Sequence, residues 1–518
     1  MPGTRFAYPD FRRFIMLSYV MSGCVVGLKA CLVRVEVDLQ SGLPSFCVVG
    51  LPDTSVKESK ERVRSAFKNS DVSFPMKRIT VNLSPAHLKK EGSSFELAIA
   101  LGLLMADQQW NCQKYKEYLF LGELSLEGRL QPIRGVLPLV LSAYKQGIKT
   151  VLLPKENALE ASVVSQMNVY GIESLMEAIQ FLKEEISLTP VKFSEPSSSQ
   201  KSEIDFSEVK GQKWAKRALE IAAAGGHNVL MMGPPGCGKS MLARRLPSIL
   251  PPLTFKESLE TTQVYSVSGL LKPKESLIYE RPFRSPHHTA SYAALVGGGK
   301  NSIMPGEVSL AHHGILFLDE IPEFKRDVLE VLREPMEEGK ISVCRVNGRF
   351  LYPARFMLVA AMNPCPCGYL NHPKKDCICS DARIQHYRGK LSGPLMDRID
   401  VQVLVPAVTV EEGSSSLEES SKDILERVLK ARNIQGSRFK ECHFFTNSHM
   451  SPRAIAEFCT LESSAEKILN EAMEKFGLSY RTYHRILKVS RTLADMEGEE
   501  NIRTPHIAQA IQLRFLDR

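Results

Sequence analysis

Eight consecutive residues of this chain have the types and spacing of a loop that binds nucleotide phosphates. They are Gly233, Pro234, Pro235, Gly236, Cys237, Gly238, Lys239 and Ser240, which match G-x-x-x-x-G-K-[ST] at every fixed position. Glycines let backbone N–H groups surround phosphate oxygens, because no side chain stands in the way. The lysine adds a positive charge beside the β- and γ-phosphates, and the serine hydroxyl can bind Mg²⁺. The pattern predicts an ATP site.

The flanking residues predict the elements that position this loop. The apolar run 228–232 predicts a buried strand before it, and 241–246 predicts a helix whose N-terminus points at the phosphates. Downstream, the apolar run 314–318 predicts a second strand, which ends at Asp319 and Glu320. We expect Asp319 to hold Mg²⁺ and its water shell, and Glu320 to polarise the attacking water.

A third strand, predicted over 356–362, ends at Asn363, whose amide could orient water against the γ-phosphate. A phosphate loop, an acidic strand end and a polar strand end, in this order, predict an enzyme that hydrolyses ATP. The alternatives for the single segments are a glycine-rich turn and a strand that ends in a solvated acidic turn.

The segments around these strands resemble the AAA+ family of ATPases. Residues 205–212 resemble the segment that borders its adenine pocket, and 395–400 resemble the segment that carries its arginine finger. The resemblance implies that Arg398 reaches the γ-phosphate bound to a neighbouring subunit and stabilises the charge that spreads during transfer. It places the sensor-2 arginine of the lid at Arg481, with Arg485 as the alternative.

Length and composition agree with a multidomain protein of the cytoplasm. The 518 residues leave room for two to four domains, and the net charge of +8 permits nucleic-acid binding without requiring it. Twelve irregularly spaced cysteines in a phosphate-loop ATPase favour reduced thiols. The weakly charged stretch 14–33 superficially resembles a signal sequence, but Lys29 interrupts it and the alternating run 33–39 predicts a strand. We therefore expect no membrane partner.

Polar, serine-rich stretches and a change to helical spacing predict the domain order. We expect an extension or disordered tail over 1–16, a first domain over 17–190, a linker over 191–204, an ATPase core over 205–410, a flexible linker over 411–422 and a helical lid over 423–518.

The first domain resembles the Lon protease domain in two segments, 122–135 and 147–157. Lon cleaves peptides with a serine that a desolvated lysine deprotonates. The resemblance places Ser94 at the serine position and Leu137 at the lysine position. Because an aliphatic side chain cannot accept a proton, we predict a Lon-like fold without proteolysis.

The whole arrangement resembles the ComM/YifB type of the Mg-chelatase-like AAA+ ATPase family. The segments that carry this resemblance are 42–46, 48–53, 281–289, 305–312 and 363–368. It implies an α/β AAA+ P-loop core with an N-terminal Lon-protease-like α+β domain and a C-terminal helical lid. It also implies a homohexamer that uses ATP and Mg²⁺ to move single-stranded and branched DNA, as a helicase in branch migration and recombination of incoming DNA. The alternatives are a magnesium chelatase motor subunit, an ATP-dependent Lon-like protease and a scaffold without enzymatic activity.

A predicted hairpin supplies candidate DNA contacts. Asn347 and Gly348, between β-forming residues, predict a tight turn within 339–352. AAA+ motors of the helicase group aim a hairpin from this point into the ring pore, where basic side chains could bind phosphates. The candidates are Lys340, Arg345 and Arg349, with Lys300 of the 297–300 loop as a second site. The alternatives are an ordinary exposed hairpin and a mobile loop without a ligand.

Four cysteines within fifteen residues are candidate zinc ligands. They are Cys365, Cys367, Cys377 and Cys379, in the pattern C-x-C-x₉-C-x-C. Four thiolates can form a tetrahedral Zn²⁺ site that closes a loop too short to form its own core. C-x-C is a weaker match than C-x₂-C, and His372 could replace one ligand. The alternative is a set of oxidisable loop thiols. The pairs His287-His288 and His312-His313 are expected to form local hydrogen bonds.

Overall fold

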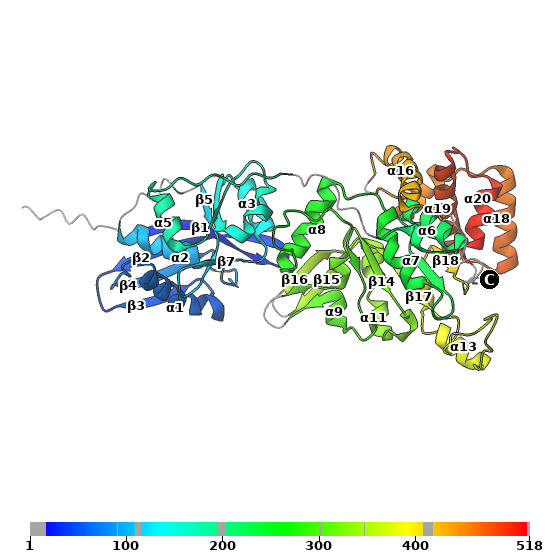
Figure 1. Cartoon of the computed structure of the whole chain (residues 1–518), viewed down its shortest axis with the longest axis horizontal. Helices are drawn as coiled ribbons and strands as arrows, with labels where there is room; N and C mark the ends of the chain where they lie inside the picture. Colours follow the sequence, from blue (N-terminus) through cyan, green and yellow to red (C-terminus); the bar gives the residue numbers. More distant parts are fainter. Residues whose placement is uncertain are drawn as a thin grey trace, which may run out of the picture. The chain divides into compact units, whose positions relative to one another are not determined.

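In a computed structural model, the protein folds into two compact units (Figure 1). The described residues are 17–90, 92–108, 115, 117–194, 204–299, 303–345, 348–407, 418–442 and 444–514. Those up to 194, together with 265–277, form unit 1, and the others form unit 2. The predicted ATPase core, 205–410, includes 265–277. The structure places this segment in unit 1, where the Ser266 hydroxyl donates to the buried carboxylate of Glu160.

Unit 1 is built on a seven-stranded mixed sheet with the order β3-β4-β2-β1-β5-β8-β9. Its strands are β1 (Leu17–Val26), β2 (Lys29–Gln40), β3 (Ser45–Val49), β4 (Arg78–Ser84), β5 (Tyr118–Phe120), β8 (Thr150–Pro154) and β9 (Asn168–Ile172). Side chains of a strand alternate between its faces, so Val33, Val35 and Val37 of β2 are all buried on one side. The alternation predicted over 33–39 is confirmed.

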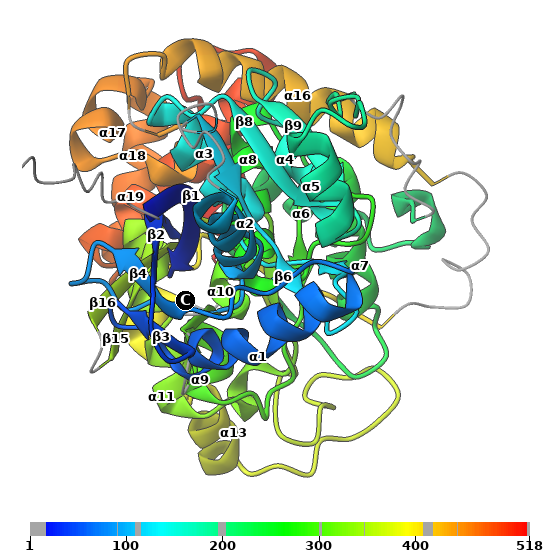
Figure 2. The same cartoon turned by 90° about the vertical axis from the view of Figure 1, so that its left-hand side faces the viewer.

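The helices of unit 1 cover this sheet. They are α1 (Thr54–Asn69), α2 (Glu96–Asp107), α3 (Val136–Lys145), α4 (Ala158–Ser162) and α5 (Leu175–Leu182), and a short hairpin joins β6 (Glu123–Leu124) to β7 (Leu130–Gln131). Residues 96–106 of α2 are buried without a break, because this helix is apolar on all sides and packs against β1 and β2 (Figure 2).

Unit 2 contains a five-stranded parallel sheet with the order β11-β14-β17-β10-β18. The strands are β10 (Val229–Met232), β11 (Phe283–Arg284), β14 (Ile315–Leu318), β17 (Met357–Met362) and β18 (Val401–Leu404). Every residue of the three central strands is buried, as expected for parallel strands covered on both faces. The strands predicted over 228–232, 314–318 and 356–362 are confirmed.

The C-terminal helices share one hydrophobic core with this sheet. Val229 of β10, Leu493 of α19 and Ile507 of α20 belong to the same buried cluster. The larger helices of unit 2 are α6 (Lys213–Gly225), α7 (Lys239–Arg245), α8 (Phe255–Ser268), α16 (Ser421–Arg438), α17 (Pro452–Phe458), α18 (Ser463–Phe476), α19 (Tyr480–Glu497) and α20 (Thr504–Gln512); α8 crosses into unit 1 after Val264. The predicted helix 241–246 and the predicted helical lid are confirmed.

Shorter elements complete unit 2. They are α9 (Tyr292–Val296), β12 (Gly297–Gly298), β13 (Met304–Pro305), α10 (Glu307–Leu310), α11 (Arg326–Glu330), α12 (Arg333–Glu338), β15 (Lys340–Arg345), β16 (Gly348–Pro353), α13 (Asp381–Arg388) and α14 (Gly393–Met396). Of the helices in the described ranges, none has the combination of length and apolar composition needed to cross a bilayer.

Candidate functional site

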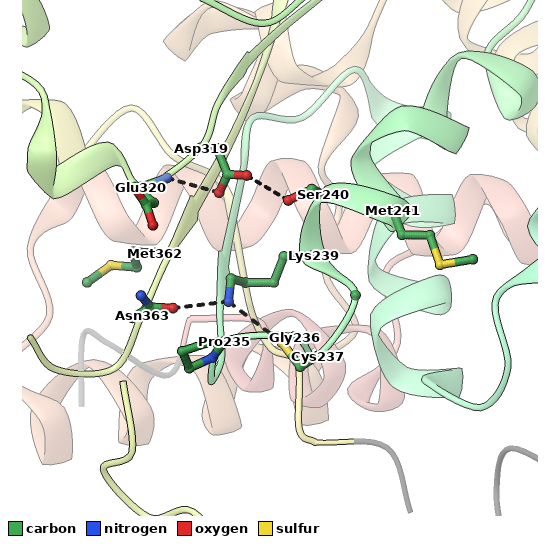
Figure 3. Close-up of a pocket in the computed structure, with 11 residues that line it drawn as sticks. Pro235, Gly236, Cys237, Lys239, Ser240, Met241, Asp319, Glu320, Met362 and Asn363 are labelled. Carbon is green, nitrogen blue, oxygen red and sulfur yellow. Dashed lines mark hydrogen bonds between the residues drawn. The ribbon is translucent and has the colours of Figure 1, made fainter. Parts of the chain in front are cut away.

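Three strand ends meet at one edge of the parallel sheet. β17 lies between β10 and β14, and Met232 pairs with Met362 in register. Because parallel strands end on the same side, the loops after these strands surround a single cavity of about 400 Å³ (Figure 3). The lining consists of residues 235–241, Asp319, Glu320, Met362 and Asn363.

Glycines shape the phosphate loop for two different reasons. Gly236 and Gly238 have φ of 76° and 93°, and a Cβ added at either would meet no atom within 4 Å. Gly233 instead allows close packing, because a Cβ there would lie 2.1 Å from the carbonyl oxygen of Val405. The loop backbone is therefore held against β18 at its start and faces open space where a phosphate group would bind.

The ammonium group of Lys239 lies inside this loop. Its Nζ donates to the carbonyl oxygens of Gly233 at 2.7 Å and Pro234 at 2.9 Å. It also donates to Oδ1 of Asn363 at 3.2 Å (Figure 3). The side chain is almost completely buried. A charge held at this point by neutral partners is suited to bind phosphate oxygens.

Two oxygen ligands for a divalent cation stand side by side. Ser240 Oγ donates to Oδ2 of Asp319 at 2.6 Å, and the backbone N–H of Glu320 donates to Oδ1 of Asp319 at 3.0 Å (Figure 3). A hydroxyl and a carboxylate are hard oxygen donors of the kind that Mg²⁺ prefers. These residues therefore fit a magnesium ion beside the phosphates.

Glu320 adopts a backbone conformation that is unusual for its residue type. Its φ is +50°, in the left-handed region, and such strained residues cluster at functional sites. Oε2 of Glu320 lies 3.8 Å from Nδ1 of His288. Sequence analysis expected only local hydrogen bonds for the histidine pair; His287 does bond Thr289 Oγ1 at 2.9 Å. The proximity of His288 to Glu320 was missed, because it arises from the pairing of β11 with β14 and has no signal in the local spacing.

The side chain of Asn363 accepts a hydrogen bond from Lys239, and the hydroxyl of Tyr387 in α13 lies near its backbone. Burial raises the pKa of Tyr387 to about 12, so the hydroxyl remains protonated. The amide of Asn363 therefore has a defined place between the lysine and the acidic strand end.

Arg398 lies outside the cavity lining of its own chain. Its guanidinium forms an ion pair with Glu337 and donates to the carbonyl oxygen of Pro394 at 2.5 Å. Its Nε is buried and has no hydrogen-bond partner among the described residues. A finger that acts on a neighbouring subunit is expected outside its own site; this role stays a prediction.

The two sensor-2 candidates have different surroundings. Arg481 is mostly exposed and pairs with Asp397 at 3.1 Å. Arg485 donates to the fully buried Asp400 at 2.7 Å. Burial alone would raise the pKa of Asp400, but Arg485 and His227 hold it well below its usual range. Arg485 therefore has a structural partner, whereas Arg481, whose role stays a prediction, is held only by a surface pair.

The predicted hairpin is confirmed as the antiparallel pair β15–β16, in which Lys340 faces Pro353 and Arg345 faces Gly348. Lys340 lies 3.5 Å from Glu338, and Arg349 donates to Ser342 Oγ at 2.7 Å. The side chain of Arg345, the turn residue Asn347 and the loop residue Lys300 lie outside the described residues. Both described basic side chains are held by local partners at the surface.

The Lon-like positions of unit 1 contain no matching dyad. Ser94 Oγ donates to the carbonyl oxygen of Gly23 at 2.8 Å, and Leu137 is fully buried in α3. Lys90, a buried lysine four residues before Ser94, donates to the carbonyl oxygen of Pro85. Burial lowers the pKa of Lys90, but the described contact of its amine is to a backbone carbonyl rather than to Ser94.

The four cysteines predicted as zinc ligands come together in space. Their Sγ atoms all lie within 4.8 Å of one another. His372, considered as a substitute ligand, is not part of this group: its Nδ1 accepts the backbone N–H of Lys374 at 3.1 Å, and its ring packs against Tyr369.

A second cluster is formed by Glu260, His312 and His313, in which Nε2 of His313 bonds Oε2 of Glu260 at 2.9 Å. His312 Nδ1 accepts the backbone N–H of Arg355 at 3.1 Å, so the proton of the neutral ring is on Nε2, which lies 3.4 Å from Glu260. A protonated nitrogen cannot bind a metal. Burial lowers the pKa of His312 to about 4. The expected local hydrogen bonding of this pair is confirmed.

Comparison with known proteins finds the same family along the whole chain. Family models described as subunit ChlI of magnesium chelatase match residues 35–157 and 205–413, and a model of the ChlI C-terminal region matches 418–514. Competence protein ComM of Haemophilus influenzae is 44% identical over 510 residues, which cover 97% of this chain and 98% of ComM. YifB of Escherichia coli is 40% identical over 511 residues, with 97% and 98% covered.

A partial likeness to Lon proteases is also found. The Lon protease of Brevibacillus choshinensis is 28% identical over 159 residues, which cover 28% of this chain and 20% of that protease.

Proposed function

Because the chain belongs to the Mg-chelatase-like AAA+ family of the ComM/YifB type, we propose that it is an ATP-hydrolysing motor that moves DNA. The observation that carries the ATPase is the convergence of Lys239, the Ser240–Asp319 pair and Asn363 on one cavity. The name of the Haemophilus influenzae relative, competence protein, supports a role in the recombination of incoming DNA. We place the protein in the cytoplasm.

Each residue of the cavity has a part in this proposal. The phosphate loop and Lys239 bind the phosphates of ATP. Ser240 and Asp319 hold Mg²⁺, which neutralises charge on the phosphate oxygens. Glu320 polarises the attacking water, and Asn363 orients it. Zn²⁺ at the four-cysteine cluster is a further proposed metal.

The proposed assembly is a homohexameric ring. In it, Arg398 leaves Glu337 and reaches the γ-phosphate bound to the neighbouring subunit, which explains why its guanidinium lies outside the cavity of its own chain. Arg481 is the proposed sensor-2 residue, since its side chain is exposed and only loosely paired.

The proposed DNA-binding element is the β15–β16 hairpin. Lys340 and Arg349 lie on opposite strands of it, and Arg345 is the partner of Gly348 at its end. Positive side chains on a hairpin that projects into a ring pore bind the backbone phosphates of single-stranded and branched DNA, whatever its sequence.

The test measures ATP hydrolysis with and without single-stranded, duplex and branched DNA. In the triple variant Lys340→Ala, Arg345→Ala, Arg349→Ala, basal hydrolysis should persist, while DNA stimulation and branch migration fall and DNA binding depends less on salt. The matched control removes three exposed lysines of unit 1, Lys57, Lys68 and Lys145. Normal branch migration by the hairpin variant would place the DNA-binding surface elsewhere. No response of the parent protein to any DNA would refute the DNA motor.

The descriptions of the matching models favour a second candidate, a motor subunit of magnesium chelatase. Such a subunit would hydrolyse ATP without a response to DNA and would respond instead to a partner protein that binds porphyrin. The same assay, run with DNA and with such a partner in separate arms, distinguishes the two functions.

A further inference from the structure

The loop that carries the four cysteines has no regular secondary structure to stabilise its conformation. Residues 363–380, all of them described, contain no helix or strand between the end of β17 and the start of α13. Irregular loops longer than about 12–15 residues are uncommon in compact domains. We call residues 364–380 the cysteine loop (yellow, beside α13 in Figure 1). Its large apolar side chains are few, Tyr369, Leu370 and Ile378, and Ile378 is exposed, so we expect a cross-link to fix the loop.

Three of the sulfur atoms have separations close to those of a tetrahedral metal site, and the fourth, of Cys379, lies within 4.8 Å of each of them. Sγ of Cys365 lies 3.4 Å from that of Cys367 and 3.6 Å from that of Cys377, and Cys367 and Cys377 are also 3.6 Å apart. Zinc–sulfur bonds of about 2.3 Å at tetrahedral angles place neighbouring sulfurs about 3.8 Å apart. The observed separations differ from this value by 0.2–0.4 Å, a shift that small side-chain rotations supply.

All four thiols are free. An all-sulfur set of four favours zinc over the harder cations Mg²⁺ and Ca²⁺.

We propose that Cys365, Cys367, Cys377 and Cys379 bind one Zn²⁺ as four thiolates, and that this zinc holds the cysteine loop against the ATP site. The first part is independent of the proposed ATPase. The second part rests on it.

Contacts of the first residues of the loop support the second part. Gly368, with φ of +83°, lies so close to the phosphate loop that an added Cβ would be 2.6 Å from Cδ of Pro235. Asn363 directly precedes the loop, and Arg388 of α13 donates through Nε to the carbonyl oxygen of Pro364 at 3.2 Å. The cysteine loop therefore touches the phosphate loop and holds the Asn363 backbone, both of which line the cavity.

The metal is tested on the full-length protein, purified under reducing conditions without added metal. We expect one equivalent of zinc per chain by elemental analysis, and its loss in the double variant Cys377→Ser, Cys379→Ser. The control Cys47→Ser changes an exposed cysteine of unit 1 and should keep the zinc. Exchange into Co²⁺ should give the intense visible absorption of a tetrahedral thiolate site. This test of the parent protein holds even if the double variant does not fold.

The contact with the phosphate loop is tested by Gly368→Ala. The variant should retain zinc, while the displaced phosphate loop lowers kcat/KM for ATP by about tenfold or more. Gly436→Ala is the control, because a Cβ at Gly436 would meet no atom within 4 Å. An unchanged kcat/KM in Gly368→Ala would refute the contact and leave the zinc site standing.

Other results would overturn the zinc site itself. These are parent protein without stoichiometric zinc, zinc retained by the double variant, iron in place of zinc, or disulfides among the four cysteines in protein kept under reducing conditions. Because metal content is measured without ATP or DNA, failure of the zinc site and failure of the ATPase are distinguishable.

Discussion

Replacing Asn363 by aspartate tests where the γ-phosphate lies. The two side chains have nearly the same shape, so the change introduces a negative charge 3.2 Å from Nζ of Lys239. At an effective dielectric constant of ~20, this attraction is about 5 kcal/mol before desolvation. If desolvation offsets half of it, about 2.5 kcal/mol remains, which weakens ATP binding about 70-fold.

The same charge acts unequally on two nucleotides. Binding of either nucleotide must break the contact between Lys239 and the new carboxylate. Binding of ATP must also place the negatively charged γ-phosphate beside that carboxylate, which ADP does not require. We therefore expect Asn363→Asp to weaken binding of a non-hydrolysable ATP analogue more than binding of ADP. Asn363→Ala adds no charge and leaves Lys239 its two backbone partners, Gly233 and Pro234. Its nucleotide affinity should change less than that of Asn363→Asp, since one hydrogen bond is lost and no charge is introduced.

Calorimetric titration of both nucleotides with Mg²⁺ measures this difference. Asn433→Asp, on the exposed face of α16, controls for the change in net charge. Equal weakening of ATP-analogue and ADP binding would show that Asn363 does not face the γ-phosphate. Unchanged binding of both would refute its contact with Lys239.

The remaining predictions concern hydrolysis, the finger and acid stability. Lys239→Ala should abolish ATP binding, whereas Glu320→Gln should bind ATP and not cleave it; parental turnover by Glu320→Gln in a phosphate-release assay would contradict the role of Glu320. Arg398→Ala should lower kcat by about 10³-fold or more while ATP still binds, and mixing it with Lys239→Ala protein should restore some hydrolysis in mixed rings; no recovery in rings shown to be mixed would count against the finger. Burial lowers the pKa of His312 from its ordinary value to about 4 in the folded protein. As pH falls, the unfolded chain therefore binds this proton first, and the free energy of unfolding decreases by about 3 kcal/mol between pH ~6.5 and ~4. Thermal unfolding of His312→Gln should therefore be flatter than that of the parent between these pH values, and parallel curves would refute this assignment.

Sequence alone predicted the parts of the site that are local in the chain. The phosphate loop, Asp319 and Asn363 each follow an apolar run that can only be a buried strand, and the structure has strands at all three places. The order of these strands then brings their ends together, because β17 lies between the other two. Spacing rules suffice here, since each residue is fixed by its own strand.

Contacts between distant segments could not be predicted in this way. His288 meets Glu320 only because β11 pairs with β14. Gly368 meets Pro235 because the cysteine loop returns toward β10, and no pattern in either segment signals the contact. The C-x-C pairs were judged a weak zinc pattern from spacing, yet the fold of the loop brings all four sulfurs together. Tertiary packing, rather than local propensity, decides such contacts.

Asn228, the residue before β10, connects the strands of the proposed ATP site to the backbone of Arg398, the proposed arginine finger. Its Oδ1 accepts the backbone N–H of Leu358 in β17 at 2.8 Å, and its Nδ2 donates to the carbonyl oxygen of Arg398 at 2.9 Å. Its own N–H donates to Asp400 at 3.2 Å. β10, which begins one residue after Asn228, leads directly into the phosphate loop, and β17, which Asn228 bonds, leads to Asn363. In the proposed ring, Arg398 acts at the ATP site of the neighbouring subunit. The side-chain amide of Asn228 therefore bonds both a strand of its own subunit's ATP site and the residue proposed to act at the next one. If the proposed ring forms, Asn228 is the contact through which a displacement of β17 relative to β10 would reach the backbone of Arg398.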